Sequence, residues 1–334
     1  MRSPTRGSGV ASVGRRPPGR PLPTGLRRGL WLLAILGLLA LTAPLLATDR
    51  AWLLATDDGL RAPAFRSWLG GGGPQEPGRV LLAAPIPHAP DRLELRSALA
   101  PPSVRHWLGT DALGRDLASR VLHGARVSLG VGALAALFSL LVGLPLGALA
   151  GYRGGRADFL VSRAVETVLC FPTLLLALTL LASAPAWLRQ LSDVPRIAIV
   201  LGLTGWIPAA RYLRAEFLKL RRSDMVVAAL ASGAGHLRVM TRHILPCALA
   251  PVLITAAFAV GAAILVEASL SFLGLGVRPP VPTWGGLLAE AREQVDHAWW
   301  LALFPGCTLF LAVLGCNLIG EGLRDLLDPR RSSR

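Results

Sequence analysis

The chain has 334 residues, of which 52% are hydrophobic and 16% are charged, and its formal net charge is +15. A mean hydropathy of +0.51 is too high for a soluble domain of this length and indicates an integral membrane protein. The basic residues are mostly arginines placed between apolar runs, which is typical of charge beside a membrane and argues against a nucleic-acid-binding surface.

Five windows without charged residues are each long enough for a helix to cross the hydrocarbon layer of about 30 Å. They contain 19 to 26 residues and lie at residues 30–48, 127–152, 167–188, 244–266 and 298–320. A sixth window, 197–210, has only 14 uncharged residues. It spans the layer if the flanking Arg196 and Arg211 extend their side chains to the two interfaces. The sequence therefore predicts an all-α polytopic protein with six transmembrane helices.

Arginine placement predicts the orientation. The first 28 residues contain seven arginines and no acid, and three loops, 153–163, 211–243 and 321–334, are also rich in arginine. These regions are expected in the cytoplasm, together with both termini. Residues 49–126 oppose this reading because they contain ten arginines on the expected outer side, but charge in so long a loop has little weight in topology.

The expected organisation has five parts: an Arg-rich cytoplasmic tail (1–29), a first transmembrane helix (30–48), an extracytoplasmic segment (49–126), a five-helix core (127–320) and a cytoplasmic tail (321–334). A cleaved signal peptide is the alternative for residues 1–48. The apolar run there is longer than the usual ~7 to 15 residues and no A-x-A-like site follows it, which favours a membrane anchor.

The outer segment divides into two parts. Its Gly and Pro content, including the run from Gly70 to Gly73, predicts an irregular loop over residues 61–102. The stretch HWLGTDALGRDLASRVLHGARVSL, residues 106–129, is expected to be helical after Asp111 and to lead into the second span. There the Asp111/Arg115 and Arg115/Ser119/Arg120 spacings predict an ion-paired collar at the membrane surface, with contact to a solute as the alternative role.

Small residues four positions apart occur inside the second span. Gly143, Gly147 and Gly151 form a GxxxGxxxG series, and such a series lets another helix backbone approach closely. We expect these glycines to pack against a neighbouring helix. The four cysteines lie in apolar segments without CxxC spacing, so we expect neither a disulfide framework nor a zinc site from them.

A polar stretch, VVAALASGAGHLRVMTRHILP, interrupts the apolar runs at residues 226–246. Ser223 or Asp224 can cap a short helix over 225–232, and Gly233 and Gly235 can end it. A second short helix is expected at about 236–243, before Pro246 starts the next span.

Val226 and Leu230 are expected to share an apolar face of this helix-turn-helix. A partner protein could bind that face in a groove. Insertion of an amphipathic helix among lipid headgroups is the alternative.

The run AALASGAGHLRVMTRHILP resembles the EAA loop of ABC-importer permeases, in which Glu-Ala-Ala, three residues and Gly are followed, nine residues later, by a hydrophobic-Leu-Pro close. Val227 stands where that pattern has Glu, so a salt bridge from this position to the ATPase is in doubt. The resemblance implies an ATPase contact made by Val227, Ala228, Ala229, Gly233, His243, Leu245 and Pro246.

Three further stretches resemble signatures of the C-type permease of dipeptide, oligopeptide and nickel importers. They are LGTDALGRDLASRVLHGARVSL, EASLSFLGLGVRPPVPTWGGLL (267–288) and NLIGEGLRDLLDPR (317–330). The resemblance implies a MetI-like permease core in the bacterial cytoplasmic (inner) membrane. It also implies four partners: a homologous B-type permease, two cytoplasmic ATPase subunits and an extracytoplasmic solute-binding protein.

No catalysis and no cofactor are expected in this chain, with ATP and Mg bound by the ATPase subunits. A GxxxxGK[ST] phosphate loop is absent from the sequence, and Lys219 is its one lysine. Glu267 and Asn317 are polar residues in apolar segments that could line a pathway, with helix–helix hydrogen bonding as the alternative.

Two rival classes of protein remain to be weighed. A membrane-anchored enzyme would need a catalytic or metal-binding constellation, but GxSxG and HExxH are absent and the histidines show no metal-ligand spacing. A secondary transporter would work without an ATPase, and usually has ionisable groups at mid-membrane, which the expected spans lack. The histidines that show no metal-ligand spacing are His88, His106, His123, His236, His243 and His297.

Overall fold

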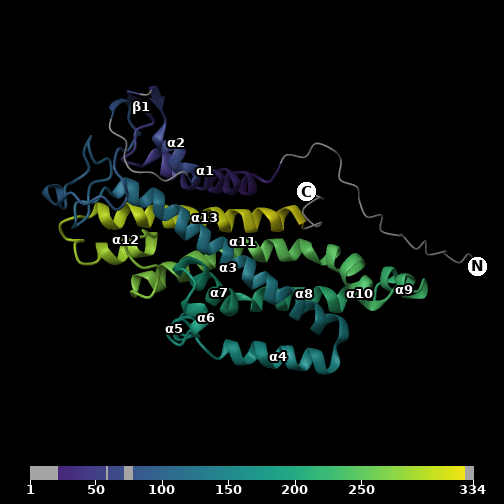
Figure 1. Cartoon of the computed structure of the whole chain (residues 1–334). Coiled ribbons are helices and arrows are strands. Elements are labelled where there is room, and N and C mark those ends of the chain that lie inside the picture. Colours follow the sequence, from purple (N-terminus) through teal and green to yellow (C-terminus); the bar gives the residue numbers. More distant parts are fainter. Residues whose placement is uncertain (1–21, 58, 71–77, 328–334) are drawn as a thin grey trace, which may run out of the picture.

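The computed structural model describes residues 22–57, 59–70 and 78–327, and this part of the chain is built mainly from helices (Figure 1). Four helices in it are long and apolar enough to cross a membrane, which confirms the expected all-α, polytopic architecture. They are α1 (Thr24–Leu46), α3 (Leu117–Arg153), α10 to α11 (His236–Phe272) and α13 (Trp300–Leu327).

The helix α3, which is 37 residues long, organises the packing. It contacts α1 and α11 as well as α7 (Asp193–Gly205) and α8 (Ile207–Leu220), while α13 packs against α1 and α11. Its start was expected directly after Asp111 but lies at Leu117. The Asp111 carboxylate instead accepts hydrogen bonds from the backbone N–H groups of Leu113 and Arg115, and such a local turn competes with a helix.

The expected span at 167–188 is not one helix. It falls across α4 (Gly155–Leu169), α5 (Thr173–Ala182) and the short α6 (Ala186–Arg189), and α4 and α5 are bent by 90° relative to each other. Pro172 explains the break, because a proline disfavours helical backbone in the residue before it and lacks the N–H that continues a helix.

The weak window at 197–210 also divides, into α7 and α8 at Trp206. Pro208 lies in the first turn of α8, and the Ser139 hydroxyl of α3 donates a hydrogen bond of 2.7 Å to the carbonyl oxygen of Gly205 at the break. By length and apolarity the described residues hold four spans, or five if α4 and α5 form one. The expected count of six is therefore not confirmed.

The outer segment is more ordered than expected. β1 (Leu53–Thr56) pairs antiparallel with both β2 (Gly59–Arg61) and β3 (Arg79–Leu82), in the order β2-β1-β3. The short helices α2 (Pro63–Trp68) and η1 (Leu95–Ser97) complete it. The prediction of an irregular loop over 61–102 is wrong for these elements, because the pairing partner of β3 lies far away in sequence. Residues 71–73 of the glycine run lie outside the described residues.

The molecule has two distinct ends (Figure 1). The sheet and α12 (Trp284–Ala291) lie at one end, and α9 (Asp224–Ala231) and α10 (His236–Arg238) lie at the other. α1 begins and α13 ends toward the α9 end. Of the two expected tails, residues 1–21 and 328–334 lie outside the described part of the chain.

Candidate functional site

The turn after α9 is formed by backbone hydrogen bonds that require an unusual conformation at Gly233. The Gly233 N–H donates to the carbonyl of Leu230, and the Ala234 N–H donates to the carbonyl of Ala229, both at 3.0 Å. This pattern ends a helix with a left-handed residue, and Gly233 has a φ of +80°. A glycine adopts that conformation without steric cost.

The second part of the loop differs from the prediction of a separate short helix at 236–243. α10 continues through a π-helical turn, η2 (Val239–Ile244), into α11 (Leu245–Phe272) without a break. Pro246 lacks an N–H for the carbonyl of Arg242, and a wider π turn just before it accommodates that missing bond. The second half of the loop and the apolar part of α11 therefore form one continuous helix.

The exposed face of the loop differs from the predicted one. Val226 is 1% exposed and packs in a cluster with Phe217 and Ile244. Four larger apolar side chains of α9 and α10 are exposed: Met225 at 38%, Leu230 at 39%, Val227 at 58% and Leu237 at 74%. We call the last three the coupling surface. Val226 thus packs α9 against its own chain, and the side chain of Val227 faces away from it.

The other residues expected in the coupling contact fall into two groups. Ala228, Gly233 and Pro246 are exposed, whereas Ala229, His243 and Leu245 are partly buried. Ala229 and Leu245 pack against the buried cluster that contains Phe217.

Two polar contacts join this loop region to the C-terminal end of α3. The Tyr152 hydroxyl lies 2.8 Å from His236 Nδ1. The Arg221 guanidinium donates to the carbonyls of Gly151 and Tyr152, at 3.4 and 3.3 Å. These carbonyls belong to the last turn of α3, where a helix leaves acceptors unpaired. The ends of α3 and α8 and the start of α10 thus form one connected unit.

The three glycines of α3 face α8. A Cβ atom built at Gly143 would lie 2.7 Å from the carbonyl oxygen of Trp206. At Gly147 the nearest atom would be the carbonyl oxygen of Ala210, at 2.5 Å, and at Gly151 that of Arg214, at 2.6 Å. The obstacles are mainly backbone atoms, so a side chain here would force the two helices apart.

We expect Gly147→Ala to lower the stability of the protein by about 1–3 kcal/mol, the usual cost of overpacking, because the backbone of Ala210 cannot move aside. Gly130→Ala is the matched control on the same helix, since a Cβ at Gly130 meets no atom within 4 Å. Thermal unfolding in detergent measures both, and equal melting temperatures for the two variants would contradict the close packing.

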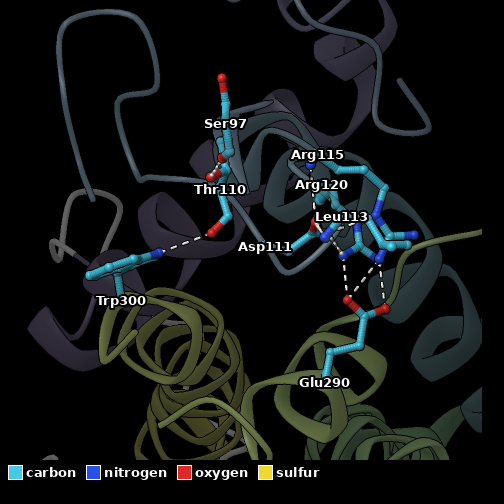
Figure 2. A network of polar contacts seen from close by, with 8 residues as sticks. All are labelled: Ser97, Thr110, Asp111, Leu113, Arg115, Arg120, Glu290 and Trp300. Carbon is cyan, nitrogen blue, oxygen red and sulfur yellow. Dashed lines mark hydrogen bonds and ion pairs between the residues drawn. The ribbon is translucent and has the colours of Figure 1, made fainter. Parts of the chain in front are cut away.

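A buried network of ion pairs occupies the opposite end of α3 (Figure 2). Asp111 accepts hydrogen bonds from Arg115 Nε at 2.7 Å and from Arg120 Nη1 at 2.5 Å. Glu290 of α12 accepts from Arg115 Nη2 at 3.0 Å and from Arg120 Nη2 at 2.8 Å. Asp111, Arg115 and Arg120 are nearly buried, whereas the Glu290 side chain is 36% exposed. Two arginines and two carboxylates balance in charge.

The predicted pairing of Asp111 with Arg115 is confirmed, and the pair lies inside the protein. The Ser119 side chain takes no part in the network; its backbone N–H donates to Asp116. Glu290 was missed because no local sequence signal links it to residues about 170 positions earlier. Nearby, Trp300 Nε1 donates to the Thr110 carbonyl at 3.1 Å, which also ties the loop before α3 to α13.

The two residues predicted to line a pathway lie in different surroundings. Glu267 is 0% exposed, and its carboxylate accepts hydrogen bonds from Ser271 at 2.7 Å and from Ser128 of α3 at 3.2 Å. The structure therefore places it in helix–helix hydrogen bonding, the alternative role. Asn317 lies on the exposed side of α13.

Two of the histidines that show no metal-ligand spacing in the sequence lie close together in the structure. His88 and His106 lie together with Asp116, and one potential ligand atom from each is within 4.8 Å of the others. Spacing along the chain could not show this, because the fold brings two separate loops to the start of α3.

Comparisons with known proteins extend these observations. Residues 143–333 match the family described as "Binding-protein-dependent transport system inner membrane component". A putative peptide transport system permease protein of Brucella suis is 44% identical over 244 residues, which cover 72% of this chain and 79% of that protein.

Two further relatives have related descriptions. The di/tripeptide transport system permease protein DppC of Pseudomonas aeruginosa is 44% identical over 239 residues, covering 70% of this chain and 77% of that protein. The oligopeptide transport system permease protein OppC of Bacillus subtilis is 38% identical over 236 residues, covering 71% and 75%. Among solved structures, the MetNI methionine ABC transporter is similar with a TM-score of 0.49 and 19% identity, covering 64% of this chain and 97% of that chain.

Proposed function

The chain belongs to the family of binding-protein-dependent transport system inner membrane components and is a permease subunit of an ABC importer; on this premise we propose that it moves di- or oligopeptides into the cell. The names of its relatives support peptides as the cargo. In this proposal a homologous B-type permease forms the other half of the pathway, and an extracytoplasmic solute-binding protein delivers the peptide.

Two cytoplasmic ATPase subunits would bind ATP and Mg and perform the hydrolysis, so this chain needs no cofactor of its own for that reaction. The proposed orientation puts α9, α10 and both termini in the cytoplasm and the sheet and α12 outside the bacterial inner membrane. Arginine-rich loops at the α9 end support this orientation.

The observation that carries the proposal is the coupling surface. Val227 and Leu230 of α9 and Leu237 of α10 expose apolar side chains at one end of the molecule, and α10 continues into α11. An apolar patch on a short helix suits a groove on a partner protein. Closure of the ATPase dimer would push this loop as a rigid body, and α3, α8 and α11 would follow, switching the pathway between inward-facing and outward-facing states.

Reconstitution tests the proposal. Proteoliposomes that contain both permeases and both ATPases should accumulate a labelled peptide when ATP is inside and the binding protein outside. Omitting the ATPases, or replacing them with a variant that binds but does not hydrolyse ATP, should stop uptake. Uptake by this chain alone would instead show a secondary transporter. The binding protein that co-purifies with the complex should bind peptides, and its failure to do so would contradict the proposed cargo.

A further inference from the structure

The cluster of His88, His106 and Asp116 lies beside the start of α3, next to the ion-pair network but sharing no side chain with it, and at the other end of the molecule from the coupling surface. All three side chains belong to residues that are less than 8% exposed. The two imidazole rings stack with their centroids 4.7 Å apart. His88 is held in place because Ile86 exchanges backbone hydrogen bonds with Leu46 and Thr48 at the end of α1. Two separate loops and a helix terminus thus converge on one site.

Hydrogen bonds define which ring nitrogens are free. His106 Nδ1 lies 2.9 Å from Asp116 Oδ2, and a carboxylate only accepts, so Nδ1 carries the proton. The other nitrogen, His106 Nε2, is buried without a hydrogen-bond partner among the described residues. His88 Nε2 lies 3.3 Å from the carbonyl of Arg105 and donates to it, which leaves His88 Nδ1 with a lone pair. Each ring therefore has one nitrogen oriented by an oxygen and one able to bind a ligand.

From this geometry we propose that His88 and His106 bind a divalent transition metal of the zinc type on the outer side of the protein, with Asp116 orienting His106 and balancing charge. Metal-ligating histidines commonly donate their second N–H to a carboxylate or a backbone carbonyl, and both rings show that arrangement here. Imidazole nitrogen is a preferred ligand of zinc and of neighbouring transition metals, whereas calcium and magnesium prefer oxygen.

The ligand atoms must move to bind one ion. One potential ligand atom from each of the three residues lies within 4.8 Å of the others. Bonds of about 2.0–2.1 Å to a tetrahedral ion bring its donors to roughly 3.3 Å apart. Because the two rings are stacked, both must rotate about their side-chain bonds so that their in-plane lone pairs converge on the ion. An unpaired buried nitrogen gains a partner in the process, which removes the cost of leaving a polar atom without a hydrogen bond.

A cavity beside the cluster gives water and an ion access to it. A cavity of about 320 Å³ adjoins it, lined by His88, Asp116, Arg92, Arg105 and Trp107, among others. Water can reach the metal through this cavity and complete its coordination. Arg105 is paired with Glu94 at 2.6 Å.

Metal binding to the purified full-length chain in detergent tests the site. After removal of metals with EDTA, Zn²⁺ alone is added, and its stoichiometry is measured by elemental analysis after gel filtration. We expect one Zn²⁺ per chain and a melting temperature that rises until one equivalent is bound. His88→Ala and His106→Ala should abolish both effects. Asp116→Asn should weaken binding by about 10–100-fold, the usual effect of losing such an orienting group.

Two controls make the test specific. His297→Ala removes an exposed histidine from the same end of the molecule and should leave Zn²⁺ binding unchanged. Mg²⁺ and Ca²⁺ should not shift the melting temperature. If His106→Ala fails to fold, His88→Ala decides, because its side chain bonds only to a backbone carbonyl within the described structure. Absence of saturable Zn²⁺ binding, or binding by His88→Ala equal to that of the parent chain, would overturn the proposal.

Discussion

Asp111→Ala is expected to lower the free energy of unfolding by about 3–5 kcal/mol, the usual cost of removing one partner from a buried ion pair. Its carboxylate accepts four hydrogen bonds, two from backbone N–H groups and two from the guanidinium groups of Arg115 and Arg120. Arg120 is only 3% exposed, so water cannot replace the lost acceptor. Glu290 would remain, but it is partly solvated and compensates less.

Thermal unfolding of the purified variant in detergent measures this effect. Glu293→Ala is the matched control, because Glu293 is an exposed acid at the same end of the molecule, and surface substitutions usually change stability by less than about 0.5 kcal/mol. Asp111→Asn should lie between the two, since it keeps one acceptor oxygen but loses the charge. If Asp111→Ala and Glu293→Ala unfold at the same temperature, the network does not stabilise the fold.

Val227→Arg is expected to reduce ATP-driven uptake at least tenfold while the chain folds normally. The side chain is 58% exposed, so the substitution does not disturb the core of this protein. In a complex it would place a charge in an apolar contact, and a loss of about 1.4 kcal/mol in binding already corresponds to a tenfold change. Uptake in proteoliposomes and retention of the ATPase during co-purification measure the effect.

Comparison variants identify the cause of that loss. Leu60→Arg, on β2 at the other end of the molecule, replaces an even more exposed leucine and should leave ATPase retention unchanged. Val226→Arg should instead prevent folding, because Val226 is buried. Val227→Glu restores the acid of the EAA pattern. If docking depends on apolar fit, it should also reduce coupling, and an increase in coupling would show that a carboxylate is preferred.

Sequence patterns predicted the long helices because their signal is local and strong. Four of the five charge-free windows lie inside long unbroken helices, to within two residues at either end, as a window of that length and apolarity permits. The fifth window, 167–188, does not form one helix because Pro172 interrupts it. A count of charged residues takes no account of proline. The end of α9 at Gly233 was also predictable from the local sequence, because glycine adopts the positive φ found there more readily than other residues do.

Tertiary structure alone decided which side chains meet. Helical spacing put Val226 on an exposed face, but packing against Phe217 buries it and leaves Val227 exposed. Glu290, and the approach of His88 to His106, depend on loops that close over long sequence distances. Such contacts have no period and no fixed spacing, so the chain determines them only through the packing of its helices.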